Sequence, residues 1–87
     1  MKHELKLCRQ FYDAVARGEK TFEVRKNDRG FKAGDELVLR AVTDDATRAY
    51  IADLPALCAD VPFILDDPNW GVAEGYVVMA ITNVRRV

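Results

Sequence analysis

The sequence predicts a small α+β domain in which a mixed sheet of about five strands curls into a β-barrel, with one or two short helices beside it. Three observations support this fold class. The 87 residues suffice for one hydrophobic core and not for two, so residues 1–87 are expected to form a single domain. The composition is 49% hydrophobic and 31% charged, as in ordinary globular proteins. Two segments between turn residues show the two-residue period of strands, three more read as strands from their apolar and β-forming residues, and one shows the period of a helix.

The first two elements are predicted to be a strand followed by a helix. Residues 3–7 alternate leucine with charged side chains, which is typical of a half-buried strand. From Cys8 to Arg17 the apolar residues instead fall on one helical stripe, and Gly18 is placed to end the helix.

A second strand is predicted over residues 21–26, before a basic loop that contains two glycines. Its alternation places Phe22 and Val24 on the core face, with Glu23 and Arg25 on the opposite face. The turn residues that follow lead into a third strand over residues 36–42.

The last two strands are predicted over residues 59–65 and 75–84. Pro62 restricts the first of them to a sheet edge or a bulge, because proline lacks the N–H that a central strand needs. The second is mostly apolar, as a buried strand is.

The segment from Thr43 to Leu57 allows two interpretations. Asp44 or Asp45 is suited to cap a short helix before Pro55, and the same stretch is equally suited to an excursion between strands.

The location and metal content of the protein are predicted from absences. The N-terminal residues contain no long apolar run, so we expect no signal peptide, no membrane contact and a cytoplasmic protein. Cys8 and Cys58 lack a C-x-x-C neighbour and have only His3 to share a metal with, so we expect packed thiols and no metal site. Nothing in the sequence indicates a cofactor.

Charge is distributed unevenly along the chain. Residues 1–34 hold nine Lys and Arg against five Asp and Glu, whereas residues 35–74 hold two against nine. A basic first third is suited to contact phosphate, although segregated charge also serves solubility alone.

The residues from Gly18 to Asp28 combine a helix end, a lysine, a threonine and an alternating Glu/Arg strand face. They resemble the ASCH branch of the PUA-like domains, in which glycine, lysine, threonine, an alternating strand and an arginine precede a Gly-Asp pair, here Gly34-Asp35. Further similarity, to a small uncharacterised bacterial and phage branch of that superfamily, lies in residues 3–6, 25–29, 64–68, Gly71 and residues 75–79.

The resemblance implies a PUA-like β-barrel with a cleft beside the helix, suited to RNA or a modified nucleotide. Lys20 and Arg25 would place two cations around the Glu23 carboxylate, which accepts from a base edge while nearby cations contact phosphate. Against this stands the interpretation that Glu23 and Arg25 are an exposed, cross-paired strand face of little energetic weight. The candidate nucleotide-binding or RNA-binding residues are Lys20, Thr21, Glu23, Arg25, Lys26, Asp28, Arg29 and Trp70.

Two further residues have open roles. Trp70 is either a stacking platform for a base or, as tryptophans in turns more often are, a cap on the core. His3 is either a surface residue of the first strand, the commoner case, or a side chain that closes one end of the cleft.

Two other function classes remain open. One ASCH subfamily hydrolyses acetylated cytidine with a lysine, a threonine and a glutamate, which implies Lys20 and Glu23 as catalytic residues here, although Glu23 stands where that pattern has its threonine. A hydrolase would then use Glu23 as a general base on water. The second alternative is a phage or mobile-element module that binds a protein partner.

Overall fold

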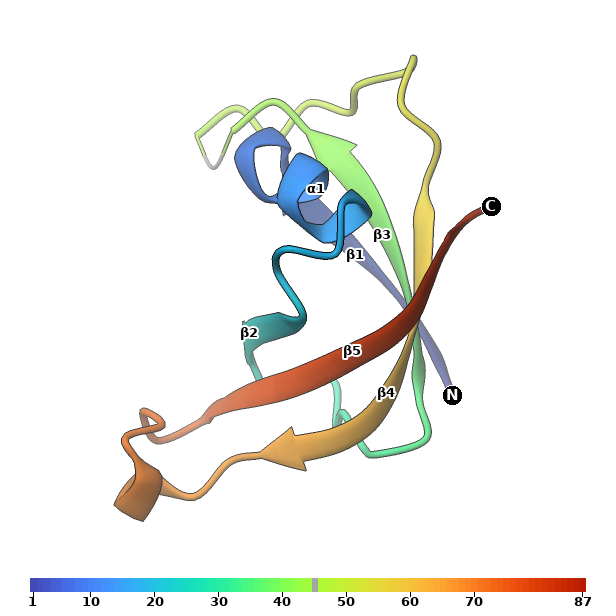
Figure 1. Ribbon diagram of the computed structural model, residues 1–87. Coiled ribbons are helices and arrows are strands. Elements are labelled where there is room, and N and C mark those ends of the chain that lie inside the picture. The colour runs from blue at the N-terminus through green and yellow to red at the C-terminus, as the bar shows by residue number, and fades with distance from the viewer. Residues whose placement is uncertain (45) are drawn as a thin grey trace.

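The computed structural model describes residues 1–44 and 46–87, and this part of the chain forms five strands and one α-helix. The elements follow one another as β1 (Lys2–Cys8), α1 (Arg9–Ala16), β2 (Phe22–Lys26), β3 (Glu36–Val42), β4 (Leu57–Leu65), the 3-10 helix η1 (Pro68–Trp70) and β5 (Tyr76–Arg86) (Figure 1). The predicted elements are therefore confirmed in type and order, and most bounds agree within two residues. Within the described residues no helix has the length and apolar character needed to cross a membrane.

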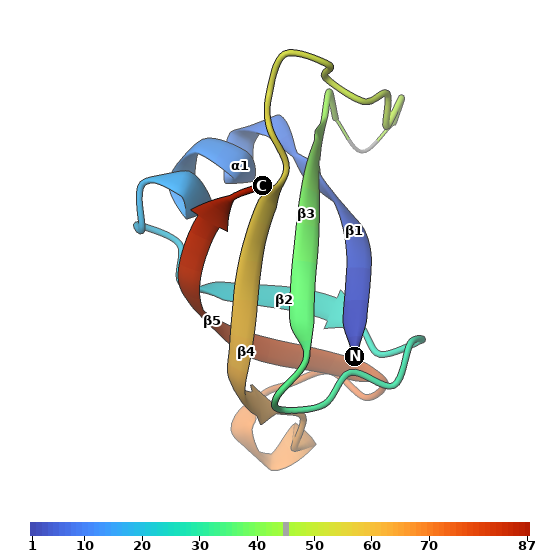
Figure 2. The ribbon, with the colours of Figure 1, turned by 90° about the vertical axis from the view of Figure 1, so that its right-hand side faces the viewer.

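The five strands form one mixed sheet in the order β1-β3-β4-β5-β2. The β1 strand runs parallel to β3, and the other neighbouring pairs are antiparallel. Strong curvature of β4 and β5 carries β2 behind β4 and β3 toward β1 (Figure 2), so the sheet is a half-barrel. β1 and β2 are its two edge strands, and the gap between them is called the seam below.

The α1 helix packs against β1, β3 and β5 and covers one opening of the half-barrel (Figure 1). Its buried side chains are Tyr12 and Val15, and the Tyr12 hydroxyl donates a hydrogen bond of 2.6 Å to the Pro55 carbonyl. The helix ends as predicted: Gly18 adopts a φ of 78°, a left-handed conformation that glycine adopts without steric cost. This end directs the chain toward β2 and the seam.

The hydrophobic core lies between the curled sheet and α1. Four apolar residues of the strands predicted over 36–42 and 75–84 have no exposed surface, namely Leu37, Leu39, Val77 and Met79. Ile64 is partly buried and packs against the same cluster.

The predicted core face of β2 is wrong. Phe22 and Val24 are 45% and 51% exposed, whereas Glu23 is 2% exposed and points inward. The alternation itself is present, but β2 is an edge strand beside the seam. Its inward side therefore faces an open hollow with cations nearby, where a paired carboxylate is tolerated, and its apolar side faces solvent.

The segments with open interpretations also have definite structures. Residues 43–56 form an excursion without a helix in their described part, and the Asp44 carboxylate accepts from the Thr47 N–H at 2.7 Å in a turn. Asp45, the other candidate cap, lies outside the described residues. Pro62 lies in a central strand, where the β4–β5 register shifts between Asp60 and Phe63, so the bulge prediction is confirmed.

Candidate functional site at the seam

A hollow of about 580 Å³ lies at the seam, between β1, the end of α1 and β2. We call it the seam hollow. The side chains that the argument below uses are Lys6, Phe11, Glu19, Lys20, Phe22, Glu23, Arg25 and Arg48, all of which line it. The three residues at the centre of the sequence prediction, Lys20, Glu23 and Arg25, are thus brought together in one concave surface.

The Glu23 carboxylate is held between two cations. Lys20 Nζ donates to its Oε1 at 2.6 Å, and Arg25 Nε donates to its Oε2 at 2.9 Å. The Glu23 side chain is only 3% exposed, while those of Lys20 and Arg25 are 16% and 22% exposed. The interpretation of Glu23 and Arg25 as an exposed strand face is therefore wrong, because the carboxylate is buried and the cations reach it from the hollow.

Each cation of this triad is also anchored to backbone. Lys20 Nζ donates to the carbonyl of Phe22 at 2.7 Å. Arg25 Nη2 donates across the seam to the carbonyl of Lys6 in β1 at 2.6 Å. Arg25 therefore joins the two edge strands of the half-barrel and is fixed in orientation before any ligand arrives.

Two half-exposed phenyl rings flank the triad. Lys20 Nζ lies 5.2 Å from the ring centroid of Phe11 and 4.9 Å from that of Phe22, which is the geometry of cation–π contacts. Phe11 and Phe22 are 40% and 45% exposed. The walls of the hollow thus combine flat apolar surfaces with charged groups.

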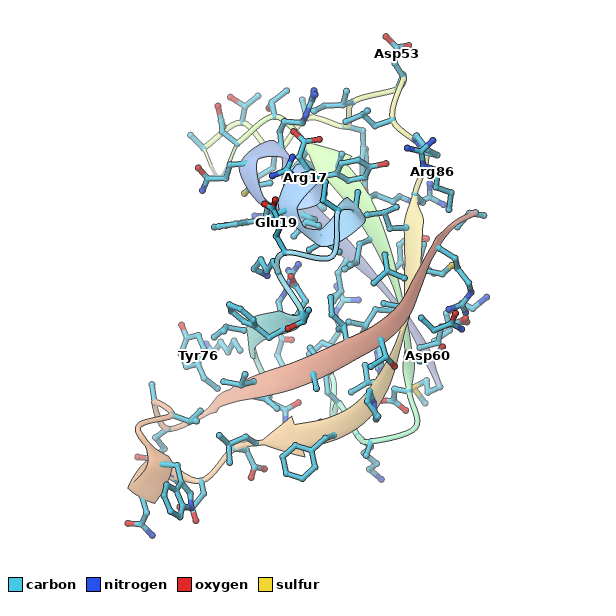
Figure 3. All side chains as sticks on the ribbon, viewed as in Figure 1. Arg17, Glu19, Asp53, Asp60, Tyr76 and Arg86 are labelled. Atoms are coloured by element: carbon cyan, nitrogen blue, oxygen red, sulfur yellow. The ribbon has the colours of Figure 1, made fainter. Side chains whose placement is uncertain are left out.

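Among the described residues that line the seam hollow, cationic side chains outnumber carboxylates. Lys6, Lys20, Arg25 and Arg48 line it, against the carboxylates of Glu19 and Glu23. Glu19, in the loop that follows α1 (Figure 3), is paired with Arg17 at 2.8 Å, and the hydrogen bond from Arg17 lowers the pKa of Glu19. The charge of Glu19 is therefore directed to Arg17, which does not line the hollow.

Five other predicted site residues, Arg29 among them, lie outside the seam hollow. Thr21, Lys26 and Asp28 are exposed and do not line it. Trp70 is 74% exposed in η1, so its prediction as a core cap is wrong, and it lines a separate apolar hollow beyond β2. That hollow also contains Tyr76, which starts β5 (Figure 3).

Arg29 lines a second hollow, which adjoins the first. This hollow shares Lys6, Arg25 and Arg48 with the seam hollow. The basic first third of the chain is thus not gathered as a whole at the two hollows: Lys26 and Lys32 line neither of them, whereas Lys6 and, from outside that third, Arg48 line both.

His3 is not a surface residue, so that interpretation is wrong. It is 5% exposed, its Nε2 lies 2.9 Å from Asp35 Oδ2, and its ring packs edge-on against Phe31 at 4.7 Å between centroids. It lines neither hollow. The main-chain N–H of Lys32 and the His3 ring both bond to the Asp35 carboxylate and lower its pKa to about 2.

Sequence reasoning missed Lys6, Phe11 and Arg48 as site residues. In the sequence, Lys6 is only a polar position of an alternating strand, and Phe11 is one of the apolar residues on the helical stripe. Arg48 lies in the segment whose structure was open. None of the three is near Glu23 in sequence, so only the curl of the sheet brings them together.

The site contains no evident metal centre in the part of the chain that the structure describes. Within residues 1–44 and 46–87, no three His, Cys, Asp or Glu side chains are grouped so as to hold a metal ion. Both cysteines are thiols, Cys58 buried and Cys8 partly buried.

Two comparisons relate the chain to other proteins. The family model described as "Domain of unknown function (DUF3850)" matches residues 2–81. A stretch of 37 residues, 42% of this chain, is 46% identical to the "Uncharacterized 12.9 kDa protein in GpA 3'region" of Escherichia phage P2. The match covers 34% of that phage protein's length. The predicted relationship to phage proteins is therefore confirmed.

Proposed function

The chain belongs to the DUF3850 family, and we propose that the seam hollow of this member binds a nucleotide, either one with a modified base or one within RNA. The observation that carries the proposal is a buried carboxylate held between two cations in a hollow walled by half-exposed phenyl rings. Proteins that recognise unpaired bases combine an aromatic stacking surface with polar groups for the base edge.

The chemistry of the triad matches this task. A carboxylate offers about four acceptor positions, of which Lys20 and Arg25 use two, so Glu23 retains positions for an exocyclic base amine. The Phe11 and Phe22 rings offer stacking surface, and the neighbouring cations suit phosphate oxygens. The volume, about 580 Å³, lies within the ordinary range of small-ligand pockets.

We also infer that the fold is PUA-like, of the ASCH type. Support comes from the curled five-stranded mixed sheet with one helix over its opening, and from the position of the hollow beside that helix. The stretch that carries the ASCH resemblance, from Gly18 to Arg25, supplies the triad itself.

The hydrolase alternative uses the same contact between Lys20 and Glu23. It requires a water at one of the remaining acceptor positions of Glu23, with a cation close to the developing oxyanion. Binding requires neither this water nor an oxyanion contact, so we propose binding. Turnover of an acetylated nucleoside would be detected by the titration described next.

The test is a calorimetric titration with nucleosides, N-acetylated cytidine, nucleoside monophosphates and a short single-stranded RNA, on the wild type and two phenylalanine variants. Phe22→Ala removes a wall of the hollow. Phe63→Ala is the matched control, because Phe63 is 63% exposed, lies two strands away in the same register row, and does not line the hollow.

We expect at least one of these ligands to bind the wild type and Phe22→Ala to weaken it about 5-fold to 150-fold, the range for loss of one stacked base. Phe63→Ala should bind as the wild type does. Equal effects of the two variants would place the ligand elsewhere. Absence of binding by every ligand in the set would reject the proposal and favour a protein partner.

A further inference from the structure

The second hollow at the seam has a volume of about 320 Å³ and continues the first along β1. We call it the cationic hollow. Its charged and aromatic lining residues are Glu4, Lys6, Arg25, Arg29, Arg48 and Tyr50. Since Lys6, Arg25 and Arg48 also line the seam hollow, a ligand in one hollow is within reach of the other.

Positive charge dominates the cationic hollow. Among the described residues that line it, four side chains are cationic and Glu4 is the carboxylate, and one of the cations, Arg25, is already paired with Glu23. The Glu4 carboxylate accepts from Arg40 Nε at 2.8 Å, so its charge is directed to a cation outside the hollow. A concave surface of one sign of charge attracts ions of the opposite sign.

The arginines of this hollow are held in place by the free edge of β1. Arg29 Nη1 donates to the carbonyl of Glu4 at 2.8 Å, and Arg25 Nη2 donates to that of Lys6 at 2.6 Å. These carbonyls are two residues apart on one strand, so they point to the same side of it. A guanidinium has five N–H donors, and one bond to a carbonyl leaves Arg29 several more for an oxyanion.

The rim of the cationic hollow carries an aromatic ring. Tyr50 is 58% exposed, and Lys6 Nζ lies 5.1 Å from its ring centroid. Lys6 Nζ also donates to the Arg48 carbonyl at 3.4 Å, which places the lysine between the two hollows that it lines.

We propose that the cationic hollow is a phosphate subsite for the ligand whose base occupies the seam hollow, with Arg29 as its specific contact. This inference rests on the proposed function, which it deepens: the ligand is a nucleotide or an oligonucleotide, and not a neutral nucleoside. The phosphate is either the terminal group of a mononucleotide or the phosphodiester that joins two nucleotides.

The test compares the affinities of a nucleoside, its monophosphates and a dinucleotide for the wild type and three variants. Arg29→Gln removes the cation that lines only the cationic hollow, and Arg29→Lys keeps the charge without the planar group. Lys26→Gln is the matched control, because Lys26 is exposed and lines neither hollow. Far-UV circular dichroism checks that each variant folds.

We expect the wild type to bind the phosphorylated ligands at least about tenfold more tightly than the nucleoside, as charge-assisted hydrogen bonds imply. Arg29→Gln should lower the affinity for the phosphorylated ligands about tenfold and leave the affinity for the nucleoside unchanged. Arg29→Lys should lower the affinity for the phosphorylated ligands less than Arg29→Gln does. Lys26→Gln should change neither affinity. Tighter binding of the dinucleotide than of the monophosphate identifies the phosphodiester as the source, and the reverse order identifies the terminal phosphate.

Failure of this inference is distinguishable from failure of the proposed function. If nucleoside and nucleotide bind equally and Arg29→Gln has no effect, the phosphate subsite is wrong and the nucleotide site remains. If no nucleoside or nucleotide binds, the proposed function fails, and inorganic pyrophosphate then tests the cationic hollow alone. Pyrophosphate that binds the wild type and not Arg29→Gln supports the anion site, and equal binding to both overturns it.

Discussion

Glu23 is the residue on which both the integrity of the seam and the proposed base recognition depend. Its carboxylate is almost fully buried, and its two oxygens bond to Lys20 and Arg25. A buried carboxylate is stable only when it is paired, and a half-paired group costs more than an exposed one. The triad therefore holds β2 in the orientation that exposes Phe22 to the seam hollow.

Replacing Glu23 by Gln should destabilise the protein as well as weaken binding. The amide has one acceptor oxygen in place of two, so Lys20 or Arg25 loses its partner, and loss of a hydrogen bond to a charged group costs about 1.5–3 kcal/mol. Solvent access of both cations moderates this cost. Urea unfolding at neutral pH measures it.

The matched control is Glu19→Gln, in the same hollow but exposed and paired with Arg17. It should leave the unfolding free energy unchanged. If Glu23→Gln is as stable as Glu19→Gln, the triad contributes nothing to the fold and the burial argument is wrong.

At the scale of the element, β2 is an edge strand whose charged face points inward, although its sequence pattern predicts that its apolar face does. Its partner β5 is buried on the side of Val77 and Met79, which lie opposite Arg25 and Glu23. The apolar residues of β2, Phe22 and Val24, are half exposed and border the seam hollow.

Two isosteric substitutions on neighbouring strands check this orientation. Val24→Thr should change the unfolding free energy by less than about 0.5 kcal/mol, as surface substitutions usually do. Val77→Thr places a hydroxyl in the fully buried face of β5 and should cost about 1–3 kcal/mol. Chemical denaturation of both variants gives the comparison, and a larger cost for Val24→Thr would restore the inward orientation predicted by the alternation.

At the scale of the whole molecule, polar contacts at two places hold the curled sheet together. One is the seam, where Arg25 and Arg29 bond to β1 carbonyls. The other is the pair of His3 in β1 and Asp35 just before β3, where both side chains are buried. The two edges of the half-barrel and the start of its parallel pair are thus fixed by ionisable groups.

The stability of the molecule should fall in acid through Asp35. Its pKa in the folded protein is about 2, lowered first by the Lys32 N–H and then by His3, whereas an unfolded Asp titrates near 3.9. A lowered folded pKa gives stability that is present above about pH 4 and is lost as the pH falls toward 2.

The side chain in Asp35→Asn cannot titrate, so this variant should not lose the stability that the wild type loses through Asp35 between about pH 4 and pH 2. The difference in unfolding free energy between the wild type and Asp35→Asn should be largest above pH 4 and shrink toward pH 2. Asp53→Asn, in the exposed excursion (Figure 3), is the control and should follow the wild-type curve. A pH-independent difference for Asp35→Asn would show that the carboxylate has no special role.

The sequence by itself determined the elements of this protein and much of its candidate site. Local periodicity and turn residues are encoded in neighbouring positions, so the strands, the α1 helix ending at Gly18 and the bulge at Pro62 were predictable. The proximity of Lys20, Glu23 and Arg25 was also local, since neither cation is more than three residues from Glu23 in sequence.

Only the tertiary structure decided which face of β2 is buried and which distant residues complete the site. A two-residue period shows that a strand has two different faces, but it does not show which face points to the core. That depends on whether the strand is central or lies at an edge beside charged partners. Lys6, Phe11 and Arg48 meet Glu23 because the sheet curls until β2 crosses β1, and no pattern in the chain records that curvature. The burial of His3 was also decided by tertiary structure. Its partner Asp35 is 32 residues away in sequence, so no local pattern indicates that the two side chains are paired.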